Sequence, residues 1–293
     1  MYSSRSRLEQ GRTKFRFRFS SRKVLRIIIP CLVLFAILPP IFFHFRLSRF
    51  HQMQVRKCGW LNDPPLVCAH GGDSSKASSN TMAAYLSALH SQVDCIEIDV
   101  SRSSDGVLFA LHDRDLQRLS GNTTSKVGHM SSKELTSNSV QQIILDVKVG
   151  PPFFEKGLAE DILNIVEKTE CRNCVIWAKS DNLAREVIKI SSEITVGYIV
   201  MREPKTGVRT NLLRMKGAEV VGVYHPLIDE KLMKILHRRN KKVYAWTVDD
   251  EESMQKMLFE NVDAIVTGDP TLLQQLMQNT RTQCLEEGYS LPN

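Results

Sequence analysis

A regular alternation of short apolar runs with amphipathic segments, beginning at Leu66, most constrains the fold of this chain. Short β-branched runs bounded by turn residues predict buried strands, and helical periodicity in the segments between them predicts helices. Strands are predicted at residues 66–70, 94–99, 107–111, 143–147, 174–178, 195–200, 220–224, 243–247 and 263–267. Helices are predicted around residues 80–92, 157–169, 181–191, 208–215, 229–238, 250–260 and 270–279.

The count of strands favours an α/β fold, the TIM (β/α)8 barrel. The link from Asp99 to Val107 is too short for a parallel crossover, which takes about a dozen residues or more, so residues 107–111 are predicted to form a local hairpin. Eight strands in βα alternation then remain, as in a TIM barrel. A doubly wound open sheet is the alternative, but no Gly-rich phosphate loop follows the first strand.

The N-terminal region is distinct in charge and hydropathy. Residues 1–57 hold 13 of the 39 Lys and Arg residues and one of the 32 acidic residues, so they carry +12 while the remainder carries −5. The main domain therefore has no basic excess of the kind that nucleic-acid binding requires, and no nucleic-acid partner is expected.

Residues 27–43 are apolar and uncharged, which predicts a membrane span near the short end of the usual range of about 17–25 residues.

The distribution of basic residues around this span predicts its orientation. Nine Lys or Arg residues precede it and four follow closely, so the positive-inside rule places the N-terminus in the cytosol and the main domain on the lumenal or extracellular side. No small-residue cleavage site is evident, which favours a retained signal-anchor of the secretory pathway. A plastid or mitochondrial transit peptide is the alternative, because the start is rich in Arg and Ser. Asn122 lies in a glycosylation pattern that agrees with a lumenal domain.

These features divide the chain into five parts. We expect a basic cytosolic tail at 1–26, a transmembrane signal-anchor at 27–46, a linker at 47–65, the barrel domain at 66–277 and a C-terminal tail at 278–293.

Of the seven cysteines, Cys68 and Cys95 lie in strand-like runs and are predicted to be small core residues. Cys171 and Cys174 form a lone C-x-x-C, a weak zinc signal that permits a disulfide in an oxidising lumen.

Acidic residues at strand ends predict a metal site. Glu97 and Asp99 share one face of a strand that otherwise looks buried, and two adjacent carboxylates are unfavourable unless a cation lies between them. Asp146 and Lys148 share a face near the end of the next barrel strand; Asp146 would complete an oxygen-ligand site for Mg²⁺ or Ca²⁺, and Lys148 would attract an anion. The alternatives are an exposed acidic strand face and a surface ion pair.

Two histidines lie at strand ends close to these acids. His70 ends the first predicted strand, and His112 follows the predicted hairpin. The carboxyl ends of barrel strands meet at one face, where TIM-barrel active sites lie. Both histidines are therefore candidates for acid–base catalysis.

A series of short motifs, in order, resembles the glycerophosphodiester phosphodiesterase family and in particular its plant membrane-anchored members. The resemblance covers about residues 66–277 and is carried by His70-Gly71-Gly72, Asn80-Thr81, Glu97-Ile98-Asp99, Ser104-Asp105-Gly106, His112-Asp113, Asp146-Val147-Lys148, Trp246-Thr247-Val248 and the segment 262–267.

The resemblance implies metal-dependent hydrolysis of glycerophosphodiesters, small-molecule substrates, to glycerol 3-phosphate and an alcohol. It further implies that Glu97, Asp99 and Asp146 bind a divalent metal, Mg²⁺ or Ca²⁺. His70 and His112 would form the acid–base pair. The resemblance also implies that Lys148 contacts phosphate and that Trp246 forms a wall of the glycerol pocket.

The sequence departs from the family pattern at four places. Gly71 stands where the family usually has Arg, Ser78 and Ser79 replace Pro and Glu, and Asp146 replaces a Glu. The crossover between His112 and Asp146 also looks short, so the barrel is expected to be shortened between its second and third strands. These departures favour an alternative function, a catalytically weak or inactive relative that binds a phosphodiester or a protein partner at the membrane.

Overall fold

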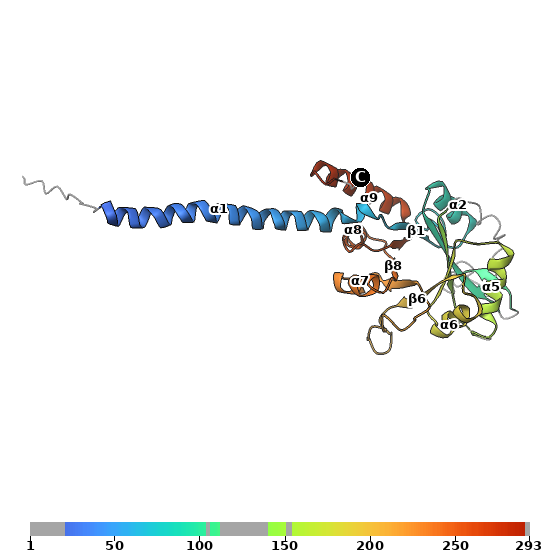
Figure 1. Cartoon of the computed structure of the whole chain (residues 1–293). Coiled ribbons are helices and arrows are strands. Elements are labelled where there is room, and N and C mark those ends of the chain that lie inside the picture. Colours follow the sequence, from blue (N-terminus) through green and yellow to red (C-terminus); the bar gives the residue numbers. More distant parts are fainter. Residues whose placement is uncertain (1–20, 104–105, 112–139, 151–153, 291–293) are drawn as a thin grey trace, which may run out of the picture. The chain divides into compact units, whose positions relative to one another are not determined.

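The computed structural model describes residues 21–103, 106–111, 140–150 and 154–290 of the chain. The chain divides into two compact units, residues 1–53 and 54–293. Helix α1 (Ser21–Cys58) supplies the described part of the first unit (Figure 1) and contains Pro30, Pro39 and Pro40. Within Ile28–Asn62, an apolar stretch of 18 residues has a mean hydropathy of 2.3 and no buried residue, so the length and composition of this segment would let it cross a membrane. A signal sequence has the same properties.

The second unit is a closed eight-stranded parallel barrel, which confirms the predicted TIM (β/α)8 fold. Because β1 pairs with β2 on one side and with β9 on the other, the sheet has no open ends and the doubly wound alternative is wrong. The short strand β3 (Leu108–Ala110) pairs antiparallel with β2, as the predicted hairpin requires. The barrel strands are β1 (Leu66–His70), β2 (Cys95–Arg102), β4 (Gln142–Val147), β5 (Cys174–Ala178), β6 (Thr195–Val200), β7 (Val220–Tyr224), β8 (Lys242–Trp246) and β9 (Ala264–Thr267).

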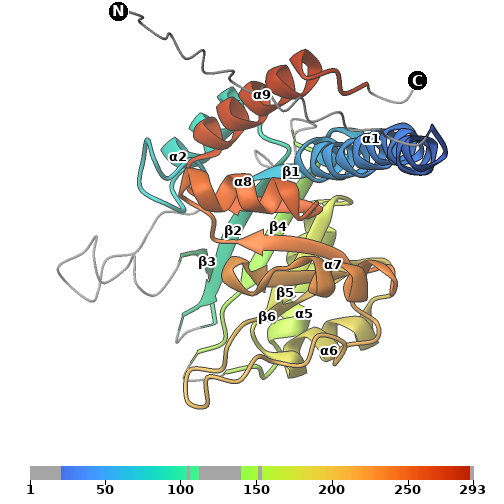
Figure 2. The same ribbon diagram turned by 90° about the vertical axis from the view of Figure 1, so that its left-hand side faces the viewer.

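Helices cover the outside of the barrel (Figure 2), and most begin at a side chain that accepts a backbone N–H. These capping residues are Thr81, Ser180, Asp229, Asp250 and Asp269. Helix α9 packs against β1 and α8. The described helices of this unit are α2 (Met82–His90), α5 (Leu158–Lys168), α6 (Asp181–Ile190), α7 (Glu230–His237), α8 (Glu251–Phe259) and α9 (Pro270–Glu286), with short 3₁₀ turns at Gly59–Asn62 and His225–Leu227.

The helix predicted at residues 208–215 is wrong. Residues 201–219 form turns and an isolated bridge between Arg202 and Arg209. Arg214 ties this segment to the barrel, because its guanidinium donates to the Asp181 carboxylate and to the carbonyl of Ile199. The backbone groups of this segment also pair outside a helix, because the Thr210 N–H donates to the Met201 carbonyl and the Leu212 carbonyl accepts from the Tyr198 hydroxyl.

Three of the expected part boundaries fall inside helices: those after residues 26 and 46 lie within α1, and that after residue 277 lies within α9. Residues 47–58, expected as part of a linker, continue α1, and residues 278–286, expected as the start of a tail, belong to α9. A disulfide joins Cys58 to Cys284, so the end of one helix is bonded to the other. The shortened crossover expected before Asp146 falls largely on residues 112–139, outside the described residues.

The barrel interior is a separate core beneath the carboxyl ends of the strands. Trp177 fills its centre, and Gly197 and Gly222 make room for it: an added Cβ at Gly222 would lie 2.7 Å from the indole ring. Cys68 and Cys95 are buried there, as predicted, but they form a disulfide, which the prediction of simple core residues missed. A third disulfide joins Cys171 and Cys174, which agrees with the disulfide interpretation of the C-x-x-C.

Candidate active site

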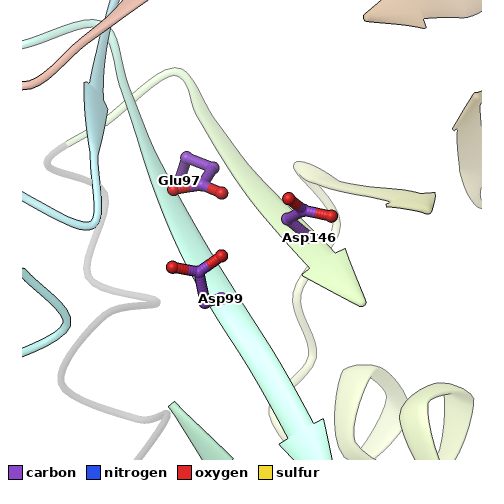
Figure 3. Close-up of side chains that lie close together, drawn as sticks. All are labelled: Glu97, Asp99 and Asp146. Atoms are coloured by element: carbon purple, nitrogen blue, oxygen red, sulfur yellow. The ribbon is translucent and has the colours of Figure 1, made fainter. Parts of the chain in front are cut away.

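Three carboxylates meet at the carboxyl ends of β2 and β4 (Figure 3). Glu97 and Asp99 extend from β2 toward the barrel axis, and Asp146 lies directly opposite Asp99 in the parallel register. Each offers a carboxylate oxygen within 4.8 Å of the others, and all three residues are buried. The spacing of Glu97 and Asp99 in the sequence predicted that both lie on one face of a strand. The register of β2 and β4 brings Asp146 to the same group of carboxylates.

The loop after β1 holds two of these carboxylates from the other side. The backbone N–H of Gly71 donates to Glu97 Oε2 at 2.9 Å, and the Asn80 amide donates to Asp99 Oδ2 at 2.8 Å. The Tyr85 hydroxyl in turn donates to Asn80 Oδ1 at 2.9 Å. Asn80 belongs to the Asn-Thr motif that the sequence singled out, and its role in the structure is to orient Asp99.

Lys148 is in direct contact with two carboxylates of the acidic cluster. Its Nζ lies 2.6 Å from Asp99 Oδ1 and donates a hydrogen bond to Asp146 Oδ2. Its side chain is only 17% exposed, so these ion pairs are largely shielded from water. The alternative interpretation of these residues, a surface ion pair, is therefore wrong, because the pair is largely buried.

Burial and mutual repulsion shift the ionisation of this cluster. Burial, followed by repulsion from Asp99 and Asp146, raises the pKa of Glu97 well above its ordinary value. Burial also raises the pKa of Asp146, against the attraction of Lys148. Burial acts to raise the pKa of Asp99 too, but the Lys148 ammonium and hydrogen bonds from Lys148 and Asn80 lower it. Burial opposes the charge on Lys148, yet Asp146, Asp99 and Glu97 raise its pKa.

The cluster has the chemistry of a site for a hard divalent cation. Asp146 Oδ1 is buried and accepts no hydrogen bond from the described residues, which leaves one carboxylate oxygen with an unmet demand for positive charge. Oxygen ligands of this kind suit Mg²⁺ and Ca²⁺. The three carboxylates therefore fit the divalent metal that the sequence predicted.

A cleft of about 360 Å³ opens above the carboxylates. His70, Lys148 and Trp246, all predicted site residues, line it. The predicted His112 lies outside the described residues, so its position relative to His70 stays a prediction. The full lining is His70, Ser79, Glu97, Asp99, Asp146, Lys148, Trp177, Lys179, Ile199, Trp246, Thr247, Asp249 and Val266.

The sequence interpretation missed Trp177, Lys179 and Asp249 as residues of this cleft. Lys179 directly follows β5, just as Lys148 directly follows β4. A residue at the carboxyl end of a barrel strand faces the active-site side of the fold, and that position was the available signal for Lys179. Trp177 carries no such signal, because its apolar strand context is typical of a core residue.

Comparison with known proteins agrees with this geometry. The model of the glycerophosphoryl diester phosphodiesterase family matches residues 70–196 and 163–272. The chain belongs to this family. It is 54% identical to glycerophosphodiester phosphodiesterase GDPD4 of Arabidopsis thaliana, covering 96% of this chain and 95% of that protein. It is 27% identical to a glycerophosphodiester phosphodiesterase of Caldanaerobacter subterraneus, covering 73% of this chain and 98% of that protein.

Solved structures of family members share the fold. A phosphodiesterase of Oleispira antarctica, in complex with the product sn-glycerol-3-phosphate, matches with a TM-score of 0.60 and 19% identity, over 73% of this chain and 97% of that one. The glycerophosphodiester phosphodiesterase of Thermotoga maritima matches with a TM-score of 0.59 and 23% identity, over 72% and 98%. The barrel of this chain is therefore the barrel of its family.

Gly71, where the family pattern has Arg, occupies a restricted position. Its φ is +62°, and an added Cβ would lie 2.8 Å from the Cβ of Ser79. Left-handed backbone disfavours a side chain, and this contact disfavours it further. A side chain at this position, where the backbone also donates to Glu97, would therefore require Ser79 or the loop to shift.

Proposed function

We propose that this protein hydrolyses glycerophosphodiesters to glycerol 3-phosphate and an alcohol, in a reaction that requires a divalent metal such as Mg²⁺ or Ca²⁺. The observation that carries the proposal is the group of three buried carboxylates at the floor of the cleft, in which one oxygen of Asp146 has no hydrogen-bond partner among the described residues. Membership of the family and the names of the relatives support the same activity.

The metal would be held by Glu97, Asp99 and Asp146. When bound, it would supply positive charge to the phosphate oxygens and lower the cost of the negative charge that develops in the transition state. Gly71 and Asn80 orient two of the three ligands through hydrogen bonds. Loss of residues that hold ligands in place in this way typically lowers metal affinity or activity about 10- to 100-fold.

The remaining groups would bind the substrate and move protons. Lys148 would face the phosphate, and Trp246 would form an apolar wall for the glycerol carbons. Of His70 and His112, one would take the proton from the nucleophile and the other would give a proton to the departing alkoxide. The nucleophile is either a water molecule or the hydroxyl of the substrate's own glycerol.

The localisation that we propose is a single-pass membrane protein of the secretory pathway with a lumenal or extracellular barrel. The exposed apolar residues of α1 and the three disulfides support it, because disulfides persist mainly in oxidising compartments.

A direct assay tests the proposed reaction. Purified protein would be incubated with glycerophosphodiesters of different alcohols, with added Mg²⁺ or Ca²⁺ or with a chelator, and release of glycerol 3-phosphate would be measured. We expect release that needs the metal and is lost on chelation. Absence of release with every substrate and both metals, from a folded protein, would reject the proposed reaction and favour the binding function.

A further inference from the structure

The floor of the cleft contains a tryptophan whose indole N–H the proposed reaction does not yet use. Trp177 lies on β5, directly opposite Asp146 of β4 in the parallel register, and is only 2% exposed. Its side chain lines the cleft, and its Nε1 has no hydrogen-bond partner among the described residues. A buried polar group without a partner is costly, so this N–H is a donor that an oxygen atom of a bound ligand would satisfy.

Trp177 extends across the barrel interior toward β8. Its ring meets the ring of Tyr244 in a T-shaped contact, with the two centroids 6.3 Å apart. Tyr244 and Trp246 are two residues apart on β8, so their side chains share the face that points into the barrel. Trp177 therefore lies at the base of Trp246, the residue that would form the wall of the glycerol pocket.

Two glycines on neighbouring strands give the indole its space. An added Cβ at Gly197 would lie 2.9 Å from the Cβ of Trp177, and an added Cβ at Gly222 would lie 2.7 Å from Cζ3 of its ring. The ring atoms nearest Gly222 are Cζ3 and Cε3, which lie on the opposite side of the indole from Nε1. The N–H is thus not directed at Gly222. Smaller apolar side chains at these three positions could fill the same core, but none of them would supply a donor.

Trp246 offers a second N–H to the same cleft. Its Nε1 is also buried without a partner among the described residues, and its ring packs against that of Tyr224, with the centroids 5.7 Å apart. An indole combines an apolar surface with a single donor, and a glycerol group combines apolar C–H groups with hydroxyl oxygens that accept. The phosphate would lie over the metal ligands on β2 and β4, which leaves the tryptophan side of the cleft to the glycerol group.

We propose that the Nε1–H of Trp177 donates a hydrogen bond to a hydroxyl oxygen of the substrate's glycerol group, which makes Trp177 a specificity-determining residue. The proposal rests on the proposed function and names the part of the substrate that this side of the cleft recognises. A site built to bond a hydroxyl rejects a ligand that lacks it, because the buried polar group of the site is then left without a partner.

The experiment compares two ligands in Trp177→Phe, which keeps an aromatic ring and removes the N–H. Affinities for sn-glycerol 3-phosphate and for n-propyl phosphate, which has the same carbon chain without hydroxyls, are measured by calorimetry in the presence of Mg²⁺. The wild type should bind glycerol 3-phosphate more tightly than propyl phosphate. Because the loss of one hydrogen bond between neutral groups weakens binding by about 3- to 10-fold, Trp177→Phe should reduce this preference by that factor.

Trp60 supplies the matched control. It is a buried tryptophan in the 3₁₀ turn Gly59–Asn62, and its Nε1 also lacks a partner among the described residues, but it does not line the cleft. Trp60→Phe removes the same atoms from the core and should keep the wild-type preference. If Trp177→Phe is too unstable for calorimetry, replacement of Trp177 by 3-benzothienylalanine, in which sulfur takes the place of the ring N–H, keeps the size of the ring and should show the same reduced preference.

The comparison of ligands separates recognition from packing. An unchanged preference in Trp177→Phe or in the benzothienyl variant would overturn the proposal, and so would a wild type with no preference. Equal weakening of both ligands would also overturn it, because the indole would then act by packing alone. With substrates, kcat/KM of Trp177→Phe should fall for a glycerophosphodiester and stay near the wild-type value for methyl nitrophenyl phosphate, which has no glycerol.

The binding measurement also keeps this proposal distinct from the proposed reaction. A wild type that prefers glycerol 3-phosphate but releases none from any diester would reject the reaction and leave the assignment of Trp177 standing. A wild type that hydrolyses glycerophosphodiesters, with an unchanged preference in Trp177→Phe, would support the reaction and reject the assignment.

Discussion

His70 on β1 and Glu97 on β2 are direct partners in the parallel register, two residues beyond the disulfide-bonded pair Cys68 and Cys95. Residues two apart on a strand point to the same face, so the disulfide lies inside the barrel, one layer below the candidate catalytic histidine and metal ligand. The covalent bond therefore fixes the alignment of the two strands that bring His70 and Glu97 together.

Removal of this disulfide should weaken both the fold and the activity. For a chain separation of 27 residues, the loop-entropy model gives about 3–4 kcal/mol of stabilisation. Cys68→Ala with Cys95→Ala should lower the free energy of unfolding by about that amount, as measured by chemical denaturation, and should reduce kcat at temperatures where the protein stays folded.

The disulfide between Cys171 and Cys174 supplies the control. Its separation of three residues closes a much shorter loop, for which the same model gives about 2 kcal/mol or less. Cys171→Ala with Cys174→Ala should therefore cost less stability and leave kcat unchanged. Equal losses of kcat in the two double variants would contradict a specific role of the Cys68–Cys95 bond in aligning the site.

Asp99→Asn tests the metal site most directly. Asp99 is the carboxylate held both by Lys148 and by Asn80, and the substitution keeps its shape while removing its charge. We expect loss of metal-dependent hydrolysis and of Mg²⁺ or Ca²⁺ binding by calorimetry, with a native circular dichroism spectrum. Added metal should also raise the Tm of the wild type, because it binds only the folded state, and should not raise the Tm of Asp99→Asn.

Glu193→Gln, which removes an exposed acid far along the chain, is the matched control and should behave as the wild type. Retention of both activity and metal affinity in Asp99→Asn would remove this residue from the metal site.

Much of the barrel could be predicted because its strands are buried β-branched runs. The bounds of β1, β5, β6 and β7 match the predicted residues, since local pattern and burial agree there. The site was predictable where motif and strand end coincide, as at Glu97 and Asp146. What could not be predicted depends on partners distant in sequence.

Two errors illustrate this limit. The helix expected at 208–215 does not form, and the segment is held instead by long-range contacts such as that of Arg214 with Asp181, 33 residues away, which no local periodicity reveals. The bond between Cys68 and Cys95 depends on the register of two parallel strands, and register is a property of the closed sheet.

The proposed membrane orientation predicts that the barrel is inaccessible to protease added from the cytosolic side. If the basic N-terminus stays in the cytosol, the domain after Arg46 should be protected from added protease in sealed microsomes and digested once detergent opens them. Asn122, outside the described residues, should then accept glycan, seen as a mobility shift that glycosidase removes. Complete digestion without detergent would reject this orientation.

His237 predicts a pH dependence of stability. Its Nε2 lies 2.9 Å from Asp263 Oδ2, and this hydrogen bond raises the pKa of His237 in the folded state. Because the pKa of His237 is higher in the folded than in the unfolded protein, protonated His237 stabilises the fold. This stabilisation is complete below the unfolded-state pKa of about 6.5 and is lost as the pH rises through the pKa of the folded state. The free energy of unfolding should therefore decline from pH 6 upward in the wild type. His237→Gln should flatten that decline, and an unchanged slope in this variant would show that the ion pair is not its source.

The two candidate histidines predict a division of labour in catalysis. A group that transfers a proton in the transition state typically contributes about 10²–10⁴ in rate, so His70→Ala and His112→Ala should each lose most of the activity. Because both act in one mechanism, the double variant should be little slower than the slower single variant. A nitrophenyl phosphodiester has a leaving group that needs no protonation, so it should rescue the variant that lacks the acid and fail to rescue the one that lacks the base. Equal loss with both substrates in both variants would contradict this division, and an unchanged rate in either single variant would remove that histidine from the mechanism.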